Sequence, residues 1–248
     1  MRYIISDIHG CYDEYMELLE KIHFSEEDEL YILGDAMDRG PEPIKVFQDI
    51  MLRPNAIYII GNHDFIMLSI MKKLAVEVTE DNYENHLSVE DLYNHACWMR
   101  DGGEVTSRQF AALLREEQQD ILEYLEESSV YEVLEDKEKQ FVLVHAGLDN
   151  FREDKGLEEY EFYDFLFTSP DYGKRYYRDE NTYLVTGHMP TVHIRPDGKP
   201  EVYQGNGHIA IDCGCVFGGK LAVYCVETGE ITYVESKKDN KELGSDDL

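Results

Sequence analysis

The chain has 248 residues, of which 43% are hydrophobic and 30% charged, as is typical of a soluble globular domain with a buried core. Its 52 acidic and 23 basic side chains give a formal net charge of -29. A surface this negative repels nucleic-acid backbones and anionic membranes, which argues against both as partners.

The first third of the chain alternates predicted strands and helices. Apolar runs at residues 3–5, 30–33 and 57–60 predict strands, and segments with helical spacing follow the first two, at 12–22 and 41–50. Because the runs are apolar throughout, both faces of the sheet should be covered, as in βαβ units.

The remaining chain predicts a helical insertion and then more strands. Residues of about 75–128 are rich in Glu, Asp, Asn and Leu, with helical spacing after residue 112, and we expect a helical cap over a site. Within it, we interpret Trp98 as a packing residue. Strands are predicted at 141–144, 183–185, 209–211, 221–224 and 231–234. We therefore expect one domain over 1–235 and a disordered charged tail over 236–248.

Five of the predicted strands end in glycine-flanked clusters of residues that can bind metals. The clusters are Asp7-x-His9-Gly10, Gly34-Asp35-x-x-Asp38-Arg39-Gly40, Gly61-Asn62-His63-Asp64, His145-Ala146-Gly147 and Gly187-His188. In α/β folds, ligands bind beyond the carboxyl ends of strands, so these side chains can converge on one site.

The donor types in these clusters predict two metal ions. The candidate ligands are Asp7, His9, Asp35, Asn62, His145 and His188. A mixed oxygen and nitrogen set suits transition metals better than Mg²⁺ or Ca²⁺. Six ligands exceed the four of one tetrahedral zinc and fit two ions that share a carboxylate. We expect two divalent ions, with manganese first and iron, zinc, cobalt or nickel as alternatives.

The motifs SDIHG, GDAMDRG, GNHD, HAG and GH resemble those of the phosphoprotein phosphatase family, within the calcineurin-like metallophosphoesterases. The resemblance spans roughly residues 3–225 and is weakest across 75–130. The stretch DCGCVFGGKL resembles bacterial diadenosine tetraphosphatases and their protein-phosphatase relatives. The family implies a four-layer α/β/β/α sandwich, in which two sheets pack face to face with helices outside.

The resemblance also implies a role for each site residue. Asp7 and His9 would bind one metal, Asn62, His145 and His188 the second, with Asp35 bridging them. A metal-bridging hydroxide would attack phosphorus. His63 would be the general acid, oriented by Asp38, and Arg39 would hold phosphate oxygens. A further phosphate-binding arginine of the family has no clear counterpart, and Arg175 and Arg178 are candidates, or simply exposed surface arginines.

The resemblance leaves two substrate classes open, a phosphoserine or phosphothreonine protein and a dinucleoside polyphosphate such as diadenosine tetraphosphate. We prefer a serine/threonine protein phosphatase, with bis(5'-nucleosyl)-tetraphosphatase as the alternative. A metal-binding scaffold that has lost catalysis is a non-enzyme alternative. The five cysteines fit no disulfide framework and no predicted leader or membrane span precedes the first strand, so we expect a cytoplasmic protein. The sequence does not indicate the oligomeric state.

Overall fold

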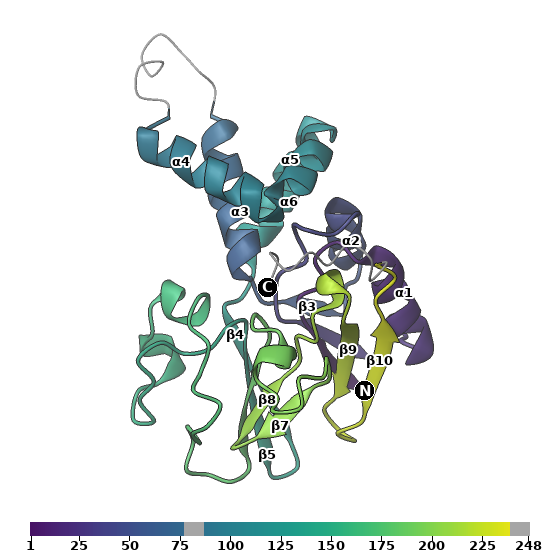
Figure 1. Cartoon of the computed structure of the whole chain (residues 1–248), viewed down its shortest axis with the longest axis vertical. Coiled ribbons are helices and arrows are strands. Elements are labelled where there is room, and N and C mark those ends of the chain that lie inside the picture. Colours follow the sequence, from purple (N-terminus) through teal and green to yellow (C-terminus); the bar gives the residue numbers. More distant parts are fainter. Residues whose placement is uncertain (77–86, 239–248) are drawn as a thin grey trace.

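The computed structural model describes residues 1–76 and 87–238, which form two five-stranded sheets with helices around them (Figure 1). The first sheet has the order β10-β9-β1-β2-β3 and the second the order β4-β5-β6-β8-β7. The first contains β1 (Arg2–Ile5), β2 (Glu29–Ile32), β3 (Ala56–Tyr58), β9 (Lys220–Cys225) and β10 (Ile231–Glu235). The second contains β4 (Tyr131–Asp136), β5 (Lys139–Val144), β6 (Thr182–Thr186), β7 (Tyr203–Gly205) and β8 (His208–Ala210).

Parallel pairing aligns the strand ends that carry the predicted clusters. β1, β2 and β3 are parallel, and Ile5 pairs with Ile32 while Ile32 pairs with Tyr58. β5 and β6 are likewise parallel, with Leu143 opposite Val185. The carboxyl ends of the strands within each parallel set therefore meet at one edge of their sheet.

Side chains that alternate along each strand fill two separate cores. Ile4 of β1 packs between the two sheets with Phe141 of β5 and Val185 of β6. The next residue, Ile5, points to the opposite face and packs in the core that contains Phe47. This alternation explains why the strand sequence is apolar without interruption.

The outer layers of the sandwich differ in regularity. α1 (Tyr12–Lys21) and α2 (Pro43–Met51) contribute to the core on the outer face of the first sheet. The outer face of the second sheet is covered by short 3₁₀ segments at Leu157–Glu159 and Phe162–Phe165, with Phe165 buried against it. The predicted α/β class with two packed sheets is confirmed, and its fourth layer consists of 3₁₀ turns and loops.

Four helices form an arm that projects from the sandwich, at the top of Figure 1. They are α3 (Asn62–Leu74), α4 (Val89–Trp98), α5 (Glu104–Ala111) and α6 (Arg115–Glu127). Between α4 and α5, a kink with non-helical backbone at Asp101 and Gly102 lies within Met99–Gly103, and Gly102 has φ +98°. The predicted insertion is helical in its described part, and residues 77–86 lie outside the described residues.

The strands β4 and β7 were not predicted from the sequence. The single-domain division stays a prediction. The predicted disordered tail falls mostly on residues 239–248, which lie outside the described part of the chain. Within the described part, the helices are too short or too polar to cross a membrane.

Candidate metal centre

All six predicted metal ligands meet where the strand ends of the two sheets converge. Asp7 and His9 follow β1 and Asp35 follows β2, whereas Asn62 begins α3 after β3. His145 and His188 follow β5 and β6 of the second sheet. The site is therefore shared by both sheets, and α3 provides one of its walls.

Short distances join the ligand atoms into two groups. Asn62 Oδ1 lies 2.8 Å from His145 Nε2 and 2.8 Å from His188 Nδ1. Asp35 Oδ2 lies 3.5 Å from His145 Nε2 and 3.6 Å from His9 Nε2. Asp35 belongs both to a group with His9 and His63 and to a group with His145 and His188. It is therefore the residue that the two groups share.

The carboxylate of Asp7 contacts the turn that carries His188. Its Oδ2 accepts a hydrogen bond of 2.9 Å from the backbone N–H of His188. A Cβ at Gly187 would lie only 2.2 Å from this oxygen, so a side chain at that position would collide with Asp7. Burial, together with Asp212 and Asp35, raises the pKa of Asp7 well above its usual range.

The hydrogen bonds of the histidines provide a test of whether metal ions fit. Nδ1 of His9 lies 2.6 Å from the carbonyl of Met37 and Nδ1 of His145 lies 2.7 Å from that of Leu33, so each Nδ1–H donates. Burial lowers the pKa of His145 to about 4, so its ring is neutral at pH 7. Both Nε2 lone pairs then face the Asp35 carboxylate. Electron pairs that converge in this way suit a cation between them, so the residues fit divalent metal ions.

Six residues of the site adopt left-handed backbone conformations, which are uncommon for non-glycine residues. They are Asp7 (φ 49°), His9 (φ 43°), Asp35 (φ 55°), Asp38 (φ 68°), Arg39 (φ 66°) and His188 (φ 65°). Backbone hydrogen bonds hold these turns, for example from Asp7 N–H to the carbonyl of Gly34 and from His9 N–H to that of Asp35. Local strain of this kind is concentrated at functional sites.

His63 and Asp38 form a buried pair beside the ligands. His63 Nδ1 lies 2.8 Å from Asp38 Oδ2, which also accepts 2.8 Å from the indole N–H of Trp98. The hydroxyl of Thr106 donates to Asp38 Oδ1 at 2.6 Å. Burial lowers the pKa of His63, but Asp35 and the bond to Asp38 outweigh this effect, and the pKa is raised overall. His63 can therefore hold a proton near neutral pH.

Two contributors to this pair were missed by the sequence reasoning. Trp98 was interpreted as packing alone, and Thr106 was not considered. Both lie in the helical insertion, 60 and 68 residues along the chain from Asp38, and neither has a spacing that would reveal the contact.

Asp64 was also given only a minor place, as a variant of the family motif. Its Oδ2 accepts hydrogen bonds from the backbone N–H of Asp35 at 2.8 Å and of Gly61 at 3.0 Å, and from the Tyr58 hydroxyl at 2.7 Å. This buried carboxylate ties the turn after β2 to the start of α3. It therefore fixes the relative positions of Asp35 and Asn62.

Arg39 reaches the cluster and an exposed carboxylate at the same time. Its Nη1 donates to His9 Nε2 at 2.8 Å, and its Nη2 lies 3.2 Å from Asp101 Oδ1. The other oxygen of Asp101 lies 3.6 Å from His63 Nε2. The Asp101 side chain is 62% exposed, so it stands between two potential cations at the mouth of the site.

Arg175 and Arg178 make their contacts elsewhere. Arg175 donates to the carbonyls of Tyr177 and Asp179 in its own loop. Arg178 pairs with Glu153 at 3.1 Å, and its side chain is 93% exposed. The structure does not bring either arginine into hydrogen-bond contact with the cluster, which gives no support to their predicted role in phosphate binding.

The fold and the converging ligands define a metallophosphoesterase. Residues 3–234 match the family described as calcineurin-like phosphoesterase, and the chain belongs to this family. The resemblance seen in the motifs is thereby confirmed, and the protein is a hydrolase.

The more specific similarities are to tetraphosphatases. The asymmetrical bis(5'-nucleosyl)-tetraphosphatase of Oceanobacillus iheyensis is 29% identical across 95% of this chain and 92% of its own length. The symmetrical enzyme of Nitrosococcus oceani is 38% identical over 100 residues, and this match spans only 36% of that protein. A crystal structure of a candidate diadenosine tetraphosphatase has a TM-score of 0.64 at 20% identity, covering 96% of this chain and 94% of that one. The structural likeness shows the fold.

Proposed function

We propose that this metallophosphoesterase hydrolyses dinucleoside polyphosphates, with diadenosine tetraphosphate as the reference substrate. The observation that carries the choice is the similarity to the Oceanobacillus iheyensis tetraphosphatase, which extends over nearly the whole of both chains. From the sequence alone we preferred a serine/threonine protein phosphatase. The names of the relatives favour the alternative, a bis(5'-nucleosyl)-tetraphosphatase.

We assign the metal ligands as the family resemblance implies: Asp7 and His9 would hold one ion, Asn62, His145 and His188 the other, and Asp35 would contact both. The short contacts of Asn62 with His145 and His188, and the position of Asp35 in both groups of potential ligands, support this assignment. When bound, two divalent ions would acidify a water molecule and neutralise charge on the phosphoryl group. Manganese is the first choice for loading, with iron, zinc, cobalt and nickel as alternatives.

The remaining chemistry belongs to the side chains around this cluster. Arg39 would bind non-bridging phosphate oxygens through its planar guanidinium, which matches phosphate geometry. His63 would donate the Nε2 proton to the leaving oxygen, while its Nδ1–H remains bonded to Asp38. Trp98 and Thr106 hold Asp38, so the helical insertion orients the acid.

The direct test compares kcat/KM of the manganese-loaded protein on diadenosine tetraphosphate and on a phosphothreonine peptide. We expect a preference for the dinucleotide of about 100-fold or more, which corresponds to about 2.7 kcal/mol of differential transition-state binding. The reverse preference would overturn the proposal and restore a protein phosphatase. Metal binding without turnover of either substrate would favour the non-enzyme scaffold.

A further inference from the structure

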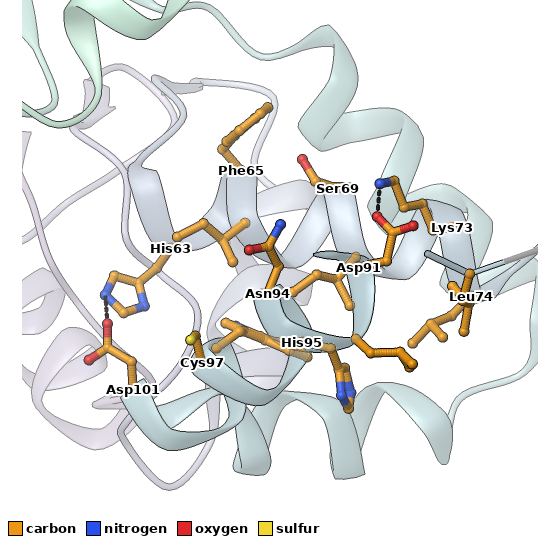
Figure 2. Close-up of a pocket in the computed structure, with 15 residues that line it drawn as sticks. His63, Phe65, Ser69, Lys73, Leu74, Asp91, Asn94, His95, Cys97 and Asp101 are labelled. Atoms are coloured by element: carbon orange, nitrogen blue, oxygen red, sulfur yellow. Dashed lines mark hydrogen bonds and ion pairs between the residues drawn. The ribbon is translucent and has the colours of Figure 1, made fainter. Parts of the chain in front are cut away.

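A cavity of about 570 Å³ opens beside His63, between α3 and α4 (Figure 2). This volume falls within the range of small-molecule binding sites. Most of its lining is apolar or aromatic and includes Phe65, Ile66, Ile70, Leu92 and Trp98. Of these five side chains, only Trp98 takes part in the metal centre, through the hydrogen bond from its indole N–H to Asp38.

The cavity is continuous with the catalytic cluster. His63 and Asp101 line one end of it, and Figure 2 shows these two side chains facing each other there. Trp98 connects the two regions, since its N–H is bonded to Asp38 while the residue also lines the cavity. A molecule that fills the cavity would therefore touch the ring of His63.

The charges at the end of the cavity away from His63 favour a neutral occupant there. The ammonium group of Lys73 pairs with the carboxylate of Asp91, so the two charges at the far end cancel. Ser69 of α3 and Asn94 of α4 add a hydroxyl and an amide from the two facing helices (Figure 2). A purine nucleoside matches this chemistry, because it has flat apolar faces and hydrogen-bonding edges. A phosphate chain does not.

We propose that this cavity binds the nucleoside on the leaving-group side of a dinucleoside polyphosphate. The inference rests on the proposed function and deepens it. The polyphosphate would pass between Arg39 and His63, where it would displace the Asp101 carboxylate that now contacts both. Because His63 lines the cavity, the fragment whose nucleoside is held there is the one that receives the proton.

Trp98 makes binding directly observable. It is the single tryptophan of the chain, so intrinsic tryptophan fluorescence reports on this cavity and on the Asp38 carboxylate beside it. Titration with adenosine 5'-monophosphate should change the emission saturably. Ribose 5-phosphate, which lacks the base, should change it much less at the same concentrations. Equal responses to both compounds would contradict a base in the cavity.

Two substitutions test the same cavity through catalysis. Ser69→Leu fills space between the helices, and Asn94→Ala removes the amide. Both should raise KM for diadenosine tetraphosphate, Ser69→Leu by at least about tenfold. The loss on p-nitrophenyl phosphate, which has no nucleoside, should be at least about tenfold smaller. Ala96→Leu is the matched control, because Ala96 is exposed on α4 and does not line the cavity.

The outcomes separate this inference from the function on which it rests. If the wild-type protein does not cleave the dinucleotide, the proposed function fails. If it does, but both variants keep the wild-type KM and the nucleotide leaves Trp98 emission unchanged, the cavity is not the nucleoside site and the proposed function stands. Turnover of p-nitrophenyl phosphate by each variant shows that its fold and metal centre are intact.

Discussion

Asp38 is the residue through which the helical insertion acts on the metal centre. One of its oxygens is shared by His63 and Trp98, and the other accepts from Thr106. The carboxylate is fully buried, so each of these bonds matters for its orientation. The position of the proposed acid is thus set jointly by α3, α4 and α5.

Replacement of His63 tests its role as the acid. His63→Asn should lower kcat by about 10²–10⁴ with metal content unchanged, because proton donation is lost and the metal ligands remain. The loss should shrink for a good leaving group such as p-nitrophenolate, which departs without a proton. Steady-state kinetics on both kinds of substrate provide the measurement. An equal loss on both would argue against proton donation.

Asp101 competes with substrate for Arg39 and His63 in the proposed site. Asp101→Asn should therefore lower KM for phosphate substrates, by about 2- to 5-fold, since an exposed charge contact is worth up to about 1 kcal/mol. Inhibition by inorganic phosphate should strengthen in parallel. Asp154→Asn is a control with the same charge change, in an exposed pair with Arg152. Equal effects of the two variants would mean that only net charge matters.

The kink between α4 and α5 is the element that lies against Arg39. The carbonyl of Gly102 accepts a hydrogen bond of 3.0 Å from Arg39 N–H. A Cβ at Gly102 would lie 2.5 Å from Cγ of Arg39, and one at Gly103 would lie 2.3 Å from the Trp98 ring. The two glycines thus permit the close approach of the insertion to the strand-end loops.

Gly102→Ala should consequently lower kcat/KM by displacing Arg39, in addition to a backbone cost of about 1 kcal/mol at positive φ. Gly198→Ala isolates the backbone cost, because Gly198 also has positive φ (62°) but nothing lies within 4 Å of its Cβ position. Thermal unfolding should show both variants destabilised, and kinetics should show loss only in Gly102→Ala. Undiminished activity of Gly102→Ala would contradict the role of the kink.

The elements near the ligands could be predicted because apolar strands and metal-binding residue types are local signals. The six candidate ligands, His63, Asp38 and Arg39 occur at strand ends in a recognisable order, and the structure brings them together, whereas their roles stay a prediction. β4 escaped prediction because Glu132, Glu135 and Asp136 interrupt its apolar residues. The left-handed turns and the contacts of Trp98 and Thr106 depend on tertiary packing. They could not be predicted because no local sequence pattern indicates them.

At the scale of the whole molecule, a net charge of -29 surrounds a site proposed to bind a polyanion. Repulsion between the two should slow association at low ionic strength. Added salt shortens the Debye length from about 30 Å at 0.01 M to about 8 Å at 0.15 M. We expect kcat/KM for diadenosine tetraphosphate to rise over this range with an inert salt. A fall would indicate that local positive charge dominates the approach.

The central claim is that two metal ions share Asp35 and perform phosphoester hydrolysis. Metal content per chain of Asp35→Asn, determined by mass spectrometry beside the wild-type protein and read with turnover of the same samples, tests this claim most directly. We predict that the wild-type protein retains two equivalents of manganese and that the variant loses metal and most of its activity. A variant with full metal content and full rate would contradict the account.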